Sequence, residues 1–328
     1  MHRSAWCLAS VLAVGWPGSS CLAAAEPPSL PQIVQRLKAE EGKLRNITVR
    51  AEGWQEVRLP GAGAWKRTPI EAAMTVRCDN APAGRIRVDY DKQVLEWRDG
   101  ASPYSFDAYS AAFDGTVQRV VRYKTGPYTH PAPILVGSIL PGRTGLCDRY
   151  TDYFTGRSFS NFYWDQDYGR SPGSLGDALD AILRSKVPNQ LTVARDMFDG
   201  APTIHVEARR GTAFDEQWSL DPAHGYALRG HRWTNGLPDG RVIVIGEEHV
   251  TKLIEAAPGI WFPSEAWHLQ QAIGSKTQIR IVYRASAVVA NDPIFDVNVF
   301  VLKFPPGCHV LDQTQHQPAT TQAANPKR

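Results

Sequence analysis

Histidine and carboxylate side chains that could bind a metal ion gather in residues 224–249. They are His224, His231, Glu247, Glu248 and His249. Imidazole and carboxylate groups are ordinary zinc ligands, but this spacing matches no zinc-site template, and His224 stands in an Asp-Pro turn. We therefore predict no metal site here and interpret the set as solvated residues of turns and strand edges.

A second chemical hypothesis concerns two carboxylates in an aromatic stretch. Asp165 and Asp167 lie beside Trp164 and Tyr168, and paired carboxylates are the catalytic groups of glycosidases. Two acids in one aromatic loop more often contact a sugar or solvent than catalyse a reaction. A secreted carbohydrate-binding or carbohydrate-active protein that uses residues 150–168 is therefore one alternative.

Several known catalytic signatures are missing from the sequence. It contains no H-E-x-x-H pair, no phosphate-binding glycine loop and no G-x-G-x-x-G motif. We predict that the protein is not an enzyme, has no catalytic residues and needs no cofactor. The formal net charge of +3, from 36 Lys and Arg against 33 Asp and Glu, is too small to indicate a nucleic-acid partner.

The first 25 residues have the pattern of a secretory signal peptide. A short basic start precedes an apolar stretch over residues 5–14, and small residues end it at Ala25. We predict cleavage after Ala25 and export to the periplasm or cell envelope. A lipid anchor at Cys21 is the alternative to plain export, although Gly18 stands where such signals usually have an aliphatic residue.

Three cysteines remain after cleavage. They are Cys78, Cys147 and Cys308, so an oxidising compartment allows at most one bridge among them. The sequence does not indicate which two would pair. Because no C-x-x-C motif is present, we interpret the cysteines as small buried apolar residues rather than redox or zinc-binding groups.

The elements that must position any site are mostly strands. Short runs rich in β-branched and aromatic residues, separated by Gly, Pro, Asn and Asp, predict an antiparallel meander over residues 214–268 and further strands on both sides of it. Helical periodicity predicts helices over residues 29–44 and 174–184. Residues 125–190 form an irregular insertion that contains the second helix, and residues 312–328 form a disordered tail.

Three short motifs give the sequence a resemblance to a known family. One is the helix-to-strand passage of residues 33–49; another is Trp218-Ser219-Leu220-Asp221-Pro222 followed by Gly225-Tyr226. The third is the Gly-Ile-Trp-Phe-Pro segment of residues 259–263, and residues 300–312 look like the closing segment of longer relatives. In these features the chain resembles the LolA/LolB-like family of exported lipoprotein-carrier proteins.

The resemblance implies an α+β fold in residues 26–311, with a strongly curved antiparallel sheet, or half-barrel, and helices covering its concave face. It implies a non-enzymatic carrier of lipid or lipoprotein acyl chains that contacts a membrane transiently and is a monomer. An RseB-like envelope sensor and a structural protein of the same fold are alternatives. A void lined by Trp54, Met74, Trp218 and Trp233 would favour the carrier, and side chains filling that volume would favour the structural protein.

Overall fold

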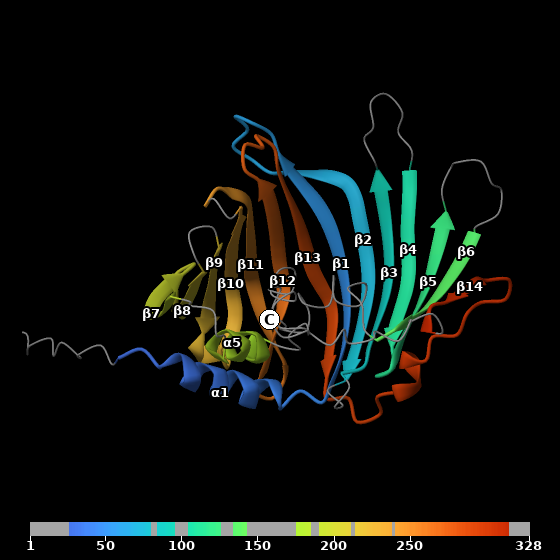
Figure 1. Cartoon of the computed structure of the whole chain (residues 1–328), viewed down its shortest axis with the longest axis horizontal. Helices are drawn as coiled ribbons and strands as arrows, with labels where there is room; N and C mark the ends of the chain where they lie inside the picture. The colour runs from blue at the N-terminus through green and yellow to red at the C-terminus, as the bar shows by residue number, and fades with distance from the viewer. Residues whose placement is uncertain are drawn as a thin grey trace, which may run out of the picture.

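The fold is built on one open, curved sheet that contains strands from both ends of the described chain (Figure 1). The structure is a computed structural model, and it describes residues 26–79, 84–95, 104–125, 134–142, 175–184, 190–210, 214–237 and 240–314. The strands are β1 (Asn46–Arg58), β2 (Lys66–Asp79), β3 (Ile86–Leu95), β4 (Tyr104–Phe113), β5 (Val117–Thr125), β6 (Ile134–Pro141), β7 (Gln190–Phe198), β8 (Ala201–Arg210), β9 (Phe214–Asp221), β10 (Ala227–Gly236), β11 (Val242–Ala257), β12 (Ile260–Ala272), β13 (Gln278–Ala290) and β14 (His309–Asp312).

Two meanders make up this sheet and share one pairing. Its strand order is β14-β6-β5-β4-β3-β2-β1-β13-β12-β11-β10-β9-β8-β7. Strands β1 to β6 pair in chain order, as do β7 to β13, and β1 pairs with β13 to join the two runs. The short edge strand β14 lies parallel to β6, whereas the other neighbouring strands are antiparallel. The predicted curved antiparallel sheet is therefore confirmed.

The first meander buries one face of each strand. In β1 the side chains of Ile47, Val49 and Ala51 are buried, and those between them are more exposed, which is the two-residue period of a strand with one buried face. The register places Val49 opposite Val76 of β2 and Val288 of β13. Side chains from β1 to β5, β12 and β13 form one apolar core on this face.

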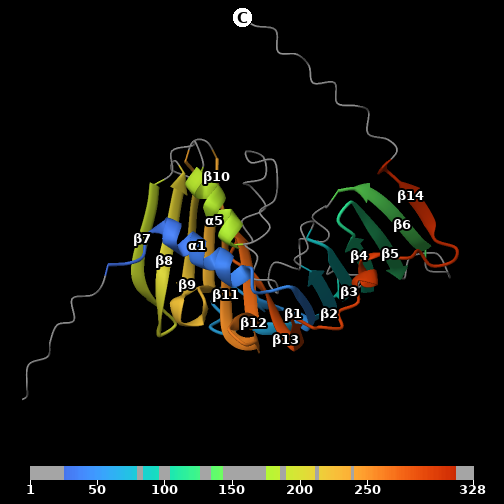
Figure 2. The same ribbon diagram turned by 90° about the horizontal axis from the view of Figure 1, so that it is seen from below.

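Two helices pack against the second meander (Figure 2). Helix α1 (Leu30–Glu41) starts after Ser29, whose backbone N–H donates to Gln32 Oε1 at 2.8 Å, and α5 spans Leu175–Arg184. Their apolar side chains recur at helical spacing and pack on β8 and β9, in a second core made of Leu30, Ile33, Val34, Leu37, Leu175, Leu179, Ile182, Ile204, Val206, Ala208, Trp218, Leu220 and Tyr226. Each fully buried aliphatic side chain of this kind contributes ~1.5–3 kcal/mol.

Both predicted helices are confirmed, but two strands are not foreseen by the sequence pattern. Strand β6 falls inside the stretch predicted as an irregular insertion, because its apolar run is short, does not alternate and contains Gly137. A Cβ at Gly137 would lie 2.7 Å from the Phe304 ring, so the glycine permits close packing of the C-terminal segment. Strand β14 has only four residues, all exposed.

Other predictions fall on residues that the structure does not describe. These are the signal peptide, Cys147, the Asp165 and Asp167 pair, and residues 315–328 of the tail. Of the described cysteines, Cys78 is buried, as predicted, and Cys308 is half-buried. In the described part of the chain, no helix is both long enough and apolar enough to cross a membrane.

Candidate ligand-binding pocket

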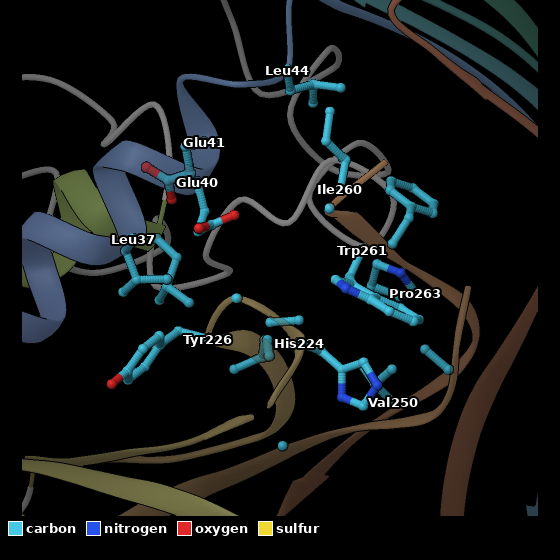
Figure 3. Close-up of a pocket in the computed structure, with 18 of the residues that line it drawn as sticks. Leu37, Glu40, Glu41, Leu44, His224, Tyr226, Val250, Ile260, Trp261 and Pro263 are labelled. Atoms are coloured by element: carbon cyan, nitrogen blue, oxygen red, sulfur yellow. The ribbon is translucent and has the colours of Figure 1, made fainter. Parts of the chain in front are cut away.

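A pocket lies between the C-terminal part of α1 and strands β10, β11 and β12 (Figure 3). Its volume is about 110 Å³. From the helices and the segment that follows α1, it is lined by Leu37, Glu40, Glu41, Leu44 and Leu175. From the sheet and its turns, it is lined by His224, Gly225, Tyr226, Ala227, Leu228, Gly230, Glu248, His249, Val250, Gly259, Ile260, Trp261, Phe262, Pro263 and Ala266.

Apolar side chains make up most of the wall. Leu37 of α1 lies on one side, and Val250 of β11 with Phe262 and Ala266 of β12 lie on the other, all of them buried. Figure 3 shows Leu37 and Val250 on opposite sides of the pocket. Water gains little hydrogen bonding against such a wall, so an apolar ligand can displace it favourably.

The turn between β9 and β10 shapes one side of the pocket. Asp221 is buried and accepts hydrogen bonds from the Ala223 backbone at 3.0 Å and from Arg229 Nε at 2.9 Å; His224 Nδ1 lies 2.7 Å from it. Burial raises the pKa of Asp221, but the hydrogen bonds and charges of Arg229 and His224 outweigh burial and lower it. The fixed turn presents His224 to Trp261, with ring centroids 4.2 Å apart and planes at 81°.

A buried cluster of charged side chains lies beside the pocket on neighbouring strands. His231 of β10 is 3% exposed, and Glu216 of β9 and Glu248 of β11 are 1% and 4% exposed. His231 Nε2 lies 3.0 Å from Glu216 Oε1, and His231 Nδ1 lies 3.2 Å from Glu248 Oε2. The second oxygen of Glu248 lies 3.1 Å from Nδ1 of His268 on β12. Because Glu248 also lines the pocket, the cluster extends to the pocket wall.

The two carboxylates keep His231 positively charged. Burial favours the neutral imidazole, but the hydrogen bonds and negative charges of Glu216 and Glu248 outweigh burial and raise the pKa of His231 to about 9. A neutral imidazole donates from only one nitrogen, whereas the imidazolium donates from both, as this geometry requires. At neutral pH the cluster therefore holds one imidazolium between two carboxylates.

Aromatic rings pack on both sides of His231. The Trp218 ring stacks on it with centroids 5.5 Å apart and planes at 7°, and the Trp233 ring lies 5.0 Å away at 25°. Trp233 lies over Gly246 of β11, where a Cβ would come within 1.9 Å of the indole. The register explains the stack, since Trp218 is opposite His231 and Trp233 is opposite Gly246.

Polar contacts join α1 to α5 next to the pocket. The Gly176 N–H, in the first turn of α5, donates to Glu41 Oε1 at 2.8 Å. Lys38 pairs with Asp180, and its Nζ lies 3.2 Å from Asp177 Oδ1. The first N–H groups of a helix have no partner within the helix, so Glu41 supplies one from outside and complements the helix dipole.

The residues predicted to face a cavity are Trp54, Met74, Trp218 and Trp233. Trp218 and Trp233 come together around His231, whereas Met74 is buried in the core of the first meander. Trp54 lies apart from both, on β1, where its indole N–H donates to Glu56 at 2.9 Å. None of the four lines the pocket described above. Contact of these residues with a ligand stays a prediction.

The interpretation of the histidines as solvated residues is wrong for part of the set. His231 and Glu248 are buried, because β10 and β11 lie inside the sheet and both side chains point to the face that carries Trp218. His224 does lie in a turn, the short helix η1 (Pro222–His224). Among the described residues, no group of three or more His, Cys, Asp or Glu side chains could hold a metal ion.

Glu216 and Glu40 were not singled out from the sequence. Glu216 sits in a polar run, but its two-residue spacing from Trp218 puts both on one strand face, and this spacing was a usable signal. Glu40 belongs to the polar side of α1 by helical periodicity. It reaches the pocket because the pocket extends past the apolar stripe of the helix.

Comparisons with known proteins identify structures but no sequence relative. No protein-family model matches this chain, and no curated protein matches it. A domain described as an outer membrane lipoprotein-sorting protein, from Vibrio parahaemolyticus, is similar in structure with 10% identity and a TM-score of 0.42. The match covers 81% of this chain and 94% of that chain.

Two further structures are similar at the same level. A DUF1329 family protein from Desulfovibrio piger has 11% identity and a TM-score of 0.37, over 84% of this chain and 97% of that one. LprF from Mycobacterium bovis has 14% identity and a TM-score of 0.24, over 82% and 99%. Likeness at this level does not say what the chain binds.

Proposed function

We propose that this chain is an exported, non-enzymatic protein that binds a lipid or lipoprotein acyl chain in the pocket between α1 and strands β10 to β12. The observation that supports the proposal most is the apolar wall formed by residues such as Leu37, Val250 and Phe262. Each methylene group transferred from water to such a wall contributes roughly 0.8 kcal/mol, so binding requires no covalent step.

In this proposal the curved sheet is a half-barrel, and α1 and α5 cover its concave face as a lid. Ligand entry requires α1 to move away from the sheet. The contacts of Lys38 and Glu41 with α5 would let the two helices move together. Such a lid needs only a modest free-energy difference between its closed and open positions.

The proposed setting is the periplasm or cell envelope. Residues 1–25 would direct export, residues 26–311 would form the binding domain and residues 312–328 a tail, with an anchor at Cys21 as the alternative to a free protein. The protein would act as a monomer that touches a membrane transiently, without metal, cofactor or nucleic acid. Trp218 and Trp233 would contact a ligand long enough to extend past Glu248. Met74 and Trp54 would contact a ligand at a second place on the concave face of the sheet.

The test is to block the pocket. Ala266 lines the pocket and is 6% exposed, so Ala266→Trp should fill it and weaken binding of dodecanol, measured by displacement of a neutral hydrophobic fluorophore, at least about tenfold. Ala287→Trp, at an exposed position of β13, is the matched control and should bind as wild type does. Native mass spectrometry of protein purified from its own host should show a bound lipid. Equal dodecanol affinity of two folded variants, or no binding by delipidated wild type, would contradict the proposal.

A further inference from the structure

The polar groups of the pocket are acidic, and its walls are partly aromatic. Three carboxylates line it, from Glu40, Glu41 and Glu248, and the described lining residues include neither Lys nor Arg. Tyr226 and Trp261 contribute aromatic rings. Carboxylates together with aromatic faces are the surroundings that ammonium groups prefer, because both attract positive charge.

Glu40 extends from α1 over the turn between β9 and β10. Gly225 in that turn has φ of 65°, and a Cβ built on it would lie 3.1 Å from Glu40 Oε2. The missing side chain therefore leaves space that the carboxylate uses. Figure 3 shows Glu40 projecting from the helix toward the sheet side of the pocket.

Lys43, just after α1, lies over the opposite turn. A Cβ built on Gly259, between β11 and β12, would lie 3.8 Å from Lys43 Nζ. The same Nζ pairs with Glu40 Oε2 at 2.6 Å, and the two side chains are 48% and 32% exposed. The Glu40–Lys43 pair thus spans the pocket between two turns. An exposed pair of this kind contributes little stability, so another cation can replace Lys43.

The far side of the pocket also favours positive charge. Two carboxyl groups, from Glu248 and Glu216, lie on this side of the pocket at the two ring nitrogens of His231. A cationic group that enters the pocket approaches the carboxyl group of Glu248 in its wall, which favours a cation over a carboxylate or phosphate.

We infer that the pocket takes an amphiphile whose head group is an ammonium cation, which displaces Lys43 from Glu40 while its alkyl chain lies along the apolar wall. This inference rests on the proposed function, since it names the class of apolar ligand that the same pocket binds. Lys43 occupies the position of the ligand's ammonium group in the structure described here.

The test compares three ligands with the same dodecyl chain: dodecylammonium, dodecanol and dodecanoate. Each displaces the neutral fluorophore from the full mature chain at low salt and below its micelle concentration. We expect dodecylammonium to bind about tenfold more tightly than dodecanol, and dodecanoate to bind most weakly. Raising the salt concentration should reduce the difference between the charged ligands.

Variants of Glu40 and Lys43 test whether this pair determines the preference for dodecylammonium. Glu40→Gln should weaken dodecylammonium binding about fivefold more than it changes dodecanol binding, while Lys43→Gln should strengthen dodecylammonium binding about threefold because the competing cation is gone. Glu71→Gln is the control, since it removes a carboxylate from an exposed Arg67–Glu71 pair of 2.8 Å on β2 and should change nothing.

The outcomes separate this inference from the proposed function. If dodecanoate binds as well as dodecylammonium, or Glu40→Gln leaves the preference for dodecylammonium intact, the ammonium inference is wrong and the apolar pocket stands. If none of the three ligands binds folded wild type, both are wrong.

Discussion

At the scale of single residues, the positions of two carboxylates keep the buried imidazole of His231 protonated. Removal from water opposes the imidazolium, and two carboxylates on neighbouring strands favour it. Both ring nitrogens have a carboxylate partner, and the Trp218 and Trp233 rings pack on the two ring faces. Removing one member would leave a buried charge without its partner, which is more costly than the intact cluster.

The stability of the protein should therefore depend on pH through His231. Glu216 and Trp218 face it from β9, Trp233 from β10, and Glu248, which His268 also contacts, from β11. The pKa is raised from 6.5 to about 9 on folding, so the stabilisation is complete below 6.5 and is lost as the pH rises through about 9. The loss should amount to ~3 kcal/mol of unfolding free energy as an order of magnitude.

Urea denaturation at a series of pH values measures this loss. His231→Gln should lower the stability at neutral pH by ~3 kcal/mol and remove most of the decline toward alkaline pH. Comparison with the variant subtracts the titration of Lys and Tyr side chains elsewhere. If wild type and variant showed the same pH dependence, His231 would not be charged in the folded protein.

At the scale of elements, local sequence explains the helices and most hairpins. Helix α1 follows Ser29 and ends before Gly42, and its buried positions recur at helical spacing. The turn between β7 and β8 has Asp199 and Gly200 with φ of 50° and 77°, which is the conformation that Asp-Gly favours between paired strands. These signals lie within a few residues of one another, so the sequence predicts them.

Other features of the elements depend on distant partners. Strand β14 is defined only by its pairing with β6, and its own four residues carry no pattern. The pocket and the buried position of Glu216 arise where α1 meets strands that come much later in the chain. The sequence motifs at Asp221 and at Gly259 to Pro263 marked two turns that line the pocket, yet they did not show that α1 closes it.

The hydrogen bond between Glu41 of α1 and the Gly176 N–H of α5 should stabilise α5. Glu41→Ala should leave the Gly176 N–H without its acceptor and destabilise the protein by ~1 kcal/mol, the usual effect of losing an N-terminal cap. Hydrogen exchange in residues 175–184 should accelerate, whereas Glu41→Gln, which keeps an acceptor oxygen, should have a smaller effect. Glu52→Ala removes a carboxylate from a distant exposed pair, Glu52–Arg284 at 4.0 Å, and should change neither quantity. Unaltered exchange in α5 of Glu41→Ala would show that the contact does not order the helix.

At the scale of the whole molecule, the pocket depends on the pairing of β1 with β13, which joins the two meanders into one sheet. Helix α1 precedes β1 in sequence, yet it packs on β8 and β9 of the second meander. This arrangement requires β1 to pair with β13, for example Ile47 with Ala290. Contacts between residues so far apart in the sequence are not visible in the period of any single strand.

Asn291 connects the end of β13 to the segment that follows α1. Just after β13, its side chain accepts from the Arg45 backbone N–H at 2.6 Å and donates to the Lys43 carbonyl at 2.9 Å. Its φ is 55°, in the left-handed region that asparagine tolerates better than most residues. The two bonds hold the segment between α1 and β1, which carries Lys43 and the pocket residue Leu44.

We therefore expect Asn291→Gly to lower the unfolding free energy by ~1 kcal/mol through the lost hydrogen bonds. Asn291→Ala should lower it by ~2 kcal/mol, because alanine adds left-handed strain. Both variants should release dodecanol faster in stopped-flow displacement, since the end of α1 would be less firmly held over the pocket. Ser286→Ala on β13, which removes an exposed hydrogen bond to the Arg50 carbonyl of 3.2 Å, should leave the release rate unchanged. If Asn291→Gly were less stable but released dodecanol at the wild-type rate, Asn291 would stabilise the pairing of β1 with β13 without positioning α1.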